Sequence, residues 1–112
     1  MEVTVEHRND TAIARVAGSV DGLTAEALQL ALRAPVDAGS ARLIGDLSGV
    51  DYTSSAGLRA LLATLKLARQ HGGDFRLAAV QPAVLRVLEL SGFTTILKVY
   101  DTVDAAVASF NA

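Results

Sequence analysis

The chain has 112 residues, of which 51% are hydrophobic and 20% charged, so it is long enough to bury its own core and too apolar to be disordered. Ten basic and twelve acidic residues give a formal charge of −2, and aromatic residues make up 4%, which argues against binding to nucleic acid. The absence of cysteine excludes disulfides and thiolate metal sites, and no apolar stretch reaches the ~20 residues of a membrane-spanning helix.

The start of the chain alternates between apolar and polar residues. Val3 and Val5 lie on one side of an extended segment, with polar residues between them. Asn9-Asp10 interrupts this pattern, and residues 11–16 resume it. Alternation on both sides of a short polar break is typical of a β-hairpin, so the sequence predicts two antiparallel strands here.

A helix is predicted after the loop over residues 18–22. The side-chain oxygen of Thr24 can accept a hydrogen bond from the first turn, and Glu26 would lie in the positive end of the helix dipole. Pro35 has no backbone N–H and its ring clashes inside a helix, so we expect this helix to end near Ala34.

The rest of the chain alternates between strands and helices. Apolar periodicity and turn residues predict, in order, a strand over 41–47, a helix over 55–70, a strand over 75–79, a helix from Gln81-Pro82 to Ser91-Gly92, a strand over 96–100 and a final helix capped by Thr102. The resulting order is ββαβαβαβα, which predicts one α/β domain. Its sheet should be mixed but mostly parallel, with about five strands, an N-terminal hairpin and about four helices.

Residues that carry catalytic or metal chemistry are sparse. His7 lies in the first strand and His71 at a helix end, so we do not expect them to form one site. Asp46 and Asp51 flank a loop, and we interpret them as a strand-end and a turn residue rather than as an acid/base pair. Neither a P-loop nor a GxGxxG motif is present. The sequence therefore predicts a binding protein without catalysis, cofactor or metal.

The stretch over residues 46–58 is the most informative part of the chain. A polar loop leaves a central strand and leads into the strongest helix, and ligands of open α/β sheets gather at that end of the strands. Ser54 and Ser55 stand at the helix start, where a serine hydroxyl can act simply as a cap. The same position favours an added phosphate of about −1.5 to −2 charges, so it also suits a phosphorylation switch.

A longer pattern runs through this loop, in which Asp46-Leu-x-x-Val-x-x-x-x-Ser55-Ala-Gly-Leu58 precedes the leucine-rich helix. Three further motifs stand in register with it, namely residues 18–25, Gly72-Gly73 and residues 82–93. Together they resemble the STAS domain family, and most closely its bacterial anti-sigma factor antagonists. The resemblance covers nearly the whole chain and implies a single STAS domain over residues 1–112.

This resemblance implies a function in partner switching. In such antagonists the unphosphorylated protein binds an anti-sigma factor that is also a serine kinase, phosphorylation of the helix-start serine breaks the complex, and a serine phosphatase restores it. The matching serine is Ser55, while Ser54 stands where the family commonly has Asp, which makes Ser54 a second candidate acceptor. Chain position and family likeness give the expected partner-binding residues as Asp21, Thr24, Thr53, Ser54, Ser55 and Arg59.

Two other functions stay open at this point. One is a constitutive STAS adaptor subunit of a membrane transporter complex for lipids or anions, with Ser55 only a helix cap. The other is nucleotide binding or slow nucleotide hydrolysis near Asp21 and Ser55, where hydroxyl and carboxylate groups gather near a helix N-terminus. The first ten residues lack the basic-then-apolar layout of a secretory signal, so we expect a cytoplasmic protein without direct membrane insertion. The sequence does not predict its oligomeric state.

Overall fold

The computed structural model describes residues 1–111 and is built on one mixed sheet with strand order β1-β2-β3-β4-β5. Its elements within these residues are β1 (Glu2–Arg8), β2 (Thr11–Ala17), α1 (Ala25–Asp37), β3 (Arg42–Gly49), α2 (Ser55–Gln70), β4 (Asp74–Ala78), α3 (Pro82–Leu90), the 3-10 helix η1 (Phe93–Thr95), β5 (Val99–Tyr100) and α4 (Val103–Phe110). β1 pairs with β2 antiparallel, and the other neighbouring strands are parallel. The predicted element order and the mixed, mostly parallel sheet are therefore confirmed.

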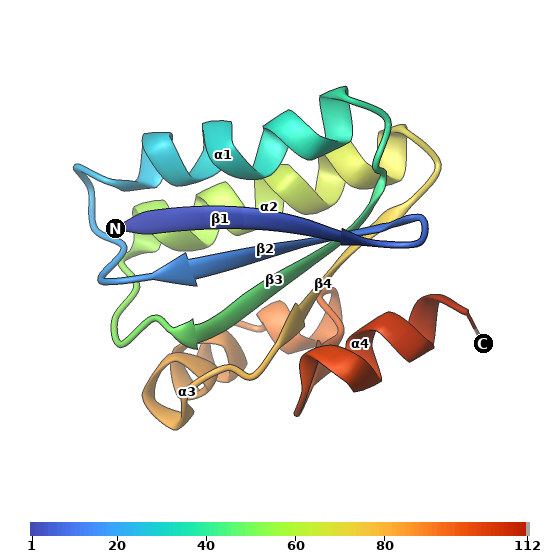
Figure 1. Ribbon diagram of the computed structural model, residues 1–112. Helices are drawn as coiled ribbons and strands as arrows, with labels where there is room; N and C mark the ends of the chain where they lie inside the picture. Colours follow the sequence, from blue (N-terminus) through green and yellow to red (C-terminus); the bar gives the residue numbers. More distant parts are fainter. Residues whose placement is uncertain (112) are drawn as a thin grey trace.

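Helices cover both faces of the sheet (Figure 1). α1 and α2 lie side by side on one face, and α4 lies on the other. The alternation along β2 explains these layers, because Ala12, Ala14 and Val16 belong to the larger core beneath α1 and α2. Ile13 points the other way and packs with Ala106 of α4. Within residues 1–111, no helix combines the length and the hydrophobicity that crossing a bilayer requires.

Helix α2 occupies the predicted range. Leu58, Leu61 and Leu65, which recur at helical spacing, are buried against the sheet. The helix stops where the chain reaches Gly72, whose φ of 83° is a left-handed conformation that glycine adopts without strain. The period of the leucines and the glycines after them thus determine this element from sequence alone.

Helix α1 is longer than predicted. It does not end near Ala34 but continues through Pro35 to Asp37. Pro35 stands in the last turn of the helix, where its missing N–H removes one hydrogen bond, and Ser40 N–H still bonds to the Pro35 carbonyl at 2.8 Å. Pro35 is buried and Val36 has no exposed surface, so apolar burial offsets the lost bond.

Strand β5 is shorter than predicted. We expected a strand over residues 96–100, but only Val99 and Tyr100 pair with β4. The preceding residues form η1, and the N–H groups of Ile96 and Leu97 both bond to the Phe93 carbonyl, at 3.1 and 2.8 Å. Backbone groups used in this local turn are not free to join the sheet.

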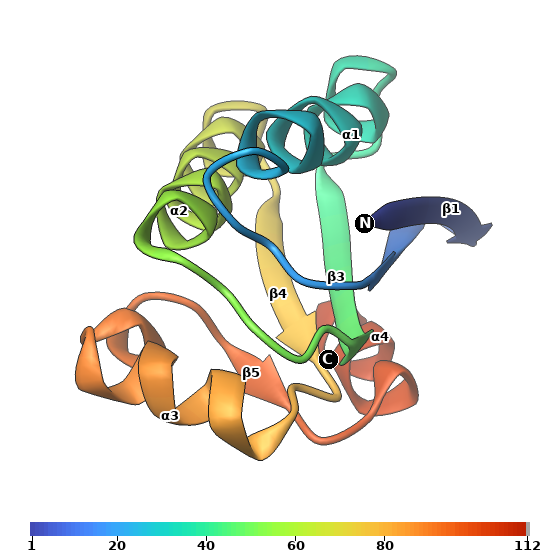
Figure 2. The ribbon, with the colours of Figure 1, turned by 90° about the vertical axis from the view of Figure 1, so that its left-hand side faces the viewer.

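The parallel strands fix where the loops meet. β2, β3 and β4 run in the same direction, so their carboxyl ends lie at one edge of the sheet, which faces the viewer in Figure 2. Loops lead from this edge to the starts of α1, α2 and α3. The segment before α2 is therefore placed among the other connecting loops.

Candidate functional site

The loop after β2 and the loop after β3 are joined side by side by backbone hydrogen bonds. The bonds run from Gly18 N–H to the Gly49 carbonyl at 2.8 Å, from Val20 N–H to the Tyr52 carbonyl at 2.9 Å, and from Ser54 N–H to the Val20 carbonyl at 2.8 Å. The β2–α1 loop is thus held against the N-terminus of α2, so two distant parts of the sequence lie side by side (Figure 2).

Gly57 allows the two loops to approach this closely. A Cβ atom at this position would lie 2.3 Å from Thr53 Oγ1 and 2.9 Å from Val20 Cγ1. Both distances are shorter than real carbon contacts, so any larger residue would push the β2–α1 loop away from α2. The glycine of the Ser-Ala-Gly-Leu sequence therefore has a packing role in shaping the site.

The two serines at the start of α2 have different roles. Ser54 is the N-cap, since its Oγ accepts a hydrogen bond from Gly57 N–H at 3.2 Å, and it is partly buried. Ser55 is the first residue of the helix and is exposed. Within residues 1–111 its hydroxyl has no hydrogen-bond partner. The capping role that the adaptor alternative gave to Ser55 therefore belongs to Ser54.

Asp21 holds the turn before α1. Its Oδ1 accepts hydrogen bonds from Leu23 N–H at 2.9 Å and from Thr24 N–H at 3.0 Å. Both hydrogen bonds hold the pKa of the Asp21 carboxyl below its ordinary value, and the bond from Leu23 N–H has the larger effect. Thr24 precedes the helix as predicted, but its side chain does not cap it, and its Oγ1 accepts from Asp21 N–H at 3.0 Å instead. The side-chain cap predicted for Thr24 is therefore wrong, and the Asp21 carboxylate fixes the turn before the helix rather than the helix end itself.

The other two expected site residues, Arg59 and Thr53, differ in their exposure to solvent. Arg59 is exposed and follows Ser55 by four residues, so both lie on the same face of α2. Thr53 is buried, and its hydroxyl donates to the Ser54 carbonyl at 3.2 Å. Arg59 belongs to the surface around Ser55, whereas Thr53 supports the loop from beneath.

Asp46 and Asp51 make separate local contacts. Asp46 is buried, accepts a hydrogen bond from Ser48 N–H at 3.0 Å and lies 3.4 Å from the Arg15 guanidinium. Asp51 is exposed and accepts from the Ser19 hydroxyl at 2.9 Å. Across residues 1–111, no three histidine or carboxylate side chains come together in a way that could hold a metal ion.

The sequence did not single out three residues of this edge. Leu23 and Tyr52 are large hydrophobic residues with 92% and 53% of their surface exposed. The Gln81 side-chain amide donates to the Ser48 carbonyl at 2.8 Å and so joins the start of α3 to the end of β3. The exposure of Leu23 could have been predicted, because it stands before the helix and outside any apolar stripe. No sequence signal indicates that Gln81 contacts Ser48.

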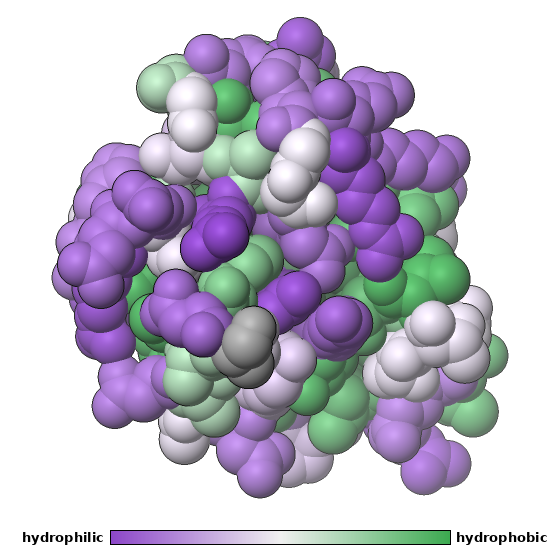
Figure 3. Space-filling model, turned by 90° about the vertical axis from the view of Figure 1, so that its right-hand side faces the viewer, coloured by the Kyte–Doolittle hydropathy of each residue, from purple (hydrophilic) through white to green (hydrophobic). Residues whose placement is uncertain are grey.

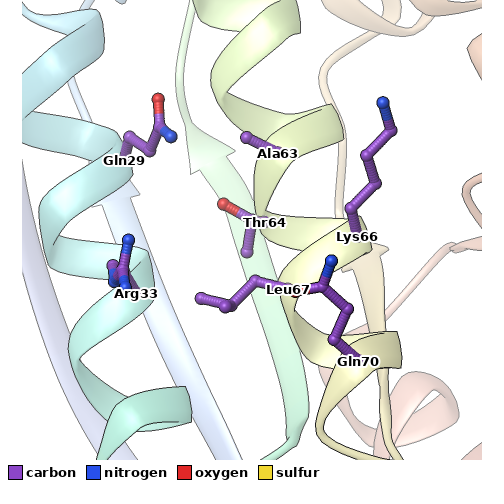
Figure 4. A pocket seen from close by; sticks show the side chains of 7 residues that line it. All are labelled: Gln29, Arg33, Ala63, Thr64, Lys66, Leu67 and Gln70. Carbon is purple, nitrogen blue, oxygen red and sulfur yellow. The ribbon is translucent and has the colours of Figure 1, made fainter.

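A pocket of about 220 Å³ lies away from this edge, between α1 and α2. Its lining residues are Gln29, Arg33, Ala63, Thr64, Lys66, Leu67 and Gln70 (Figure 4). Arg33 is paired with Asp37 at 2.9 Å, and the Thr64 hydroxyl donates to the Ala60 carbonyl at 2.8 Å. Two of its polar groups are therefore engaged within the protein.

The opposite end of the molecule is the end at which the parallel strands begin. Figure 3 shows it as mainly hydrophilic, with hydrophobic side chains gathered toward one side of the view. Ligands of open parallel sheets bind at the carboxyl ends of the strands and not at this end. We therefore place the candidate site at the joined loops around Ser55.

The chain is also similar to known proteins over nearly its whole length. The sequence profile of the STAS domain matches residues 2–106. BtrV of Bordetella bronchiseptica, named provisionally as an anti-sigma factor antagonist, is 40% identical over 110 residues, which cover 98% of this chain and 95% of BtrV. The anti-sigma-F factor antagonist RsfB of Mycobacterium tuberculosis is 31% identical over 104 residues, covering 93% and 84%.

Solved structures show the same relationship. The crystal structure of an anti-sigma factor antagonist from Mycobacterium paratuberculosis superposes with a TM-score of 0.90 and 32% identity, and the match covers 99% of this chain and 94% of that one. The sequence profile, the relatives and the solved structure each span nearly the whole chain. The chain therefore belongs to the STAS domain family.

Proposed function

We propose that this chain is an anti-sigma factor antagonist that binds an anti-sigma factor with serine kinase activity, and that phosphorylation of Ser55 controls this binding. The names of BtrV, RsfB and the mycobacterial crystal structure support the first part, since each match covers nearly the full length of both proteins. The observation that carries the second part is the division of roles in which Ser54 caps α2 and Ser55 is left exposed.

Ser55 is the better acceptor of the two serines. Its hydroxyl is exposed at the first position of α2, where a kinase can reach it. The Ser54 hydroxyl is engaged with Gly57 N–H, so its modification would remove the cap of the helix. A switch at Ser55 changes the surface charge while the fold stays intact.

The unbound protein can accommodate a phosphate at Ser55. The first turn of α2 contains no acidic residue, and the helix N-terminus carries a partial positive charge. Arg59 lies on the same face of the helix and adds a full positive charge nearby. Phosphorylation should therefore leave the isolated domain folded.

The complex, in contrast, should not tolerate this phosphate. A group of about −1.5 to −2 charges in a contact surface must be desolvated against the partner, which costs several kcal/mol unless it is paired. Because about 1.4 kcal/mol is a tenfold change in affinity, such a cost is enough to empty the complex. A serine phosphatase would then restore binding, and the chain would act as a cytoplasmic regulatory protein without catalysis of its own.

Intact-mass spectrometry tests this proposal. The purified chain is incubated with ATP and, one at a time, with each anti-sigma factor kinase of the source organism. We expect at least one kinase to add a single phosphate to the wild type and to Ser54→Ala, and none to Ser55→Ala. Equal phosphate on Ser55→Ala, or an unmodified wild type with every kinase, would contradict the proposal.

A further inference from the structure

Leu23 exposes more of its surface than the other large hydrophobic residues within residues 1–111. The exposed fraction is 92% for Leu23, against 76% for Leu90 and 62% for Leu30. Single exposed leucines are common on protein surfaces, so exposure alone assigns no role. Its position distinguishes Leu23 from the other exposed leucines, and its backbone is held in place although it lies outside a helix.

The backbone of Leu23 is held in place before any partner binds. Asp21 Oδ1 accepts its N–H at 2.9 Å and that of Thr24 at 3.0 Å. Helix α1 begins two residues later, and Ala25 N–H donates to the Asp21 carbonyl at 3.0 Å. A side chain on a fixed backbone loses less conformational freedom when a partner covers it, which favours binding.

Leu23 also stands on the same edge as Ser55. Val20, three residues before it, bonds to both Tyr52 and Ser54 through its backbone. Figure 2 shows this loop running from β2 to α1 past the start of α2. Tyr52, which is 53% exposed, adds a second apolar side chain to the edge.

The surface around Ser55 therefore has the composition of a binding interface. Leu23 and Tyr52 provide exposed apolar area, and the same loops and the start of α2 carry polar side chains, namely Asp21, Thr24, Ser54, Ser55 and Arg59. Specific protein interfaces combine an apolar centre with a polar rim in this way. The exposed leucines elsewhere, Leu30 and Leu90, lie on α1 and at the far end of α3 and do not adjoin this edge.

We propose that Leu23 is the apolar anchor of this surface and inserts into an apolar recess of the anti-sigma factor beside Ser55. The proposal rests on the proposed function, because it names the residue through which that partner is held. Water leaves the surroundings of Ser55 when Leu23 is buried, so a phosphate on Ser55 meets a drier environment and opposes binding more strongly. A residue in this position also influences which anti-sigma factor fits.

Calorimetric titration without ATP tests the anchor. The titrant is the kinase that phosphorylates Ser55 in the mass-spectrometry experiment, and the variants are Leu23→Ala and, as a matched exposed leucine, Leu90→Ala. We expect Leu23→Ala to raise Kd about 10- to 100-fold and Leu90→Ala to leave it unchanged. In the kinase assay Leu23→Ala should raise KM with kcat retained. Thermal unfolding of both variants should match that of the wild type.

The outcomes distinguish a failure of the Leu23 proposal from a failure of the proposed function. If the wild type binds and Leu23→Ala binds with the same Kd, the anchor is wrong and the proposed function stands. If Leu90→Ala weakens binding as much as Leu23→Ala, the apolar contact lies elsewhere and the anchor is again wrong. If no kinase binds or modifies the wild type, both proposals are wrong.

Discussion

The hydroxyl of Ser54 accepts a hydrogen bond from the backbone N–H of Gly57 at 3.2 Å, and this contact closes the first turn of α2. The neighbouring Ser55 is exposed and does not cap the helix. The fold thus separates the residue that stabilises the helix from the residue that is available for modification. Substitutions at the two positions should consequently have different effects.

Ser54→Ala should destabilise the protein, because it removes the cap of α2. We expect the free energy of unfolding to fall by about 0.5–2 kcal/mol. Ser55→Ala, the matched control, should change it by less than about 0.5 kcal/mol. Urea denaturation followed by circular dichroism measures both values, and equal losses for the two variants would show that the cap is misassigned.

Gly57→Ala should be destabilising even though alanine favours helices. The added Cβ would lie 2.3 Å from Thr53 Oγ1 and 2.9 Å from Val20 Cγ1, so both side chains must shift. We expect a loss of about 1–3 kcal/mol in the free energy of unfolding. Gly22→Ala is the control, since nothing lies within 4 Å of its Cβ position, and it should gain about 0.4–1 kcal/mol. A neutral result for Gly57→Ala in urea denaturation would contradict this packing role.

Ser55→Asp should change stability and binding in opposite directions. A carboxylate in the first turn of α2 interacts favourably with the helix dipole, so the free energy of unfolding should rise by about 0.3–1 kcal/mol. In calorimetry against the anti-sigma factor kinase, the same variant should bind at least about tenfold more weakly than Ser55→Ala, which should resemble the wild type. Equal affinity of the two variants would count against the switch.

Asp21 should contribute to the pH dependence of stability. Its pKa in the folded protein lies below the ordinary value of 3.8, so the folded state favours the ionised carboxylate. The contribution is present above pH 3.8 and is lost as the pH falls through the folded-state pKa. In urea denaturation at pH 6, 4 and 3, the free energy of unfolding should therefore fall more steeply with decreasing pH for the wild type than for Asp21→Asn. Parallel curves would argue against this coupling.

The fold could be predicted where one local pattern decides the structure. The leucine period from Leu58 to Leu65 determines α2, and the break at Asn9-Asp10 determines the hairpin. Local rules failed where tertiary packing decides the outcome. Pro35 remains helical because its burial offsets the hydrogen bond it cannot make, and no pattern within the segment predicts that balance.

The site could be predicted only in part, for a different reason. The start of α2 is evident from the sequence, but a shift of one residue decides whether Ser54 or Ser55 caps it, and helix boundaries cannot be predicted to that precision. The contribution of Leu23 depends on backbone bonds between Val20 and the loop before α2, which join segments about thirty residues apart. Such contacts leave no periodic signal in a sequence.

Those backbone bonds have a consequence for how this kind of protein can acquire new partners. Val20 links its loop to Tyr52 and Ser54 entirely through main-chain N–H and carbonyl groups, which nearly every amino acid supplies. The link between the two loops therefore does not depend on which side chains stand at 22, 23 and 52. After duplication of such a gene, the copies could acquire different residues at 22, 23 and 52 and so bind different partners, while the backbone hydrogen bonds between the loops stay the same.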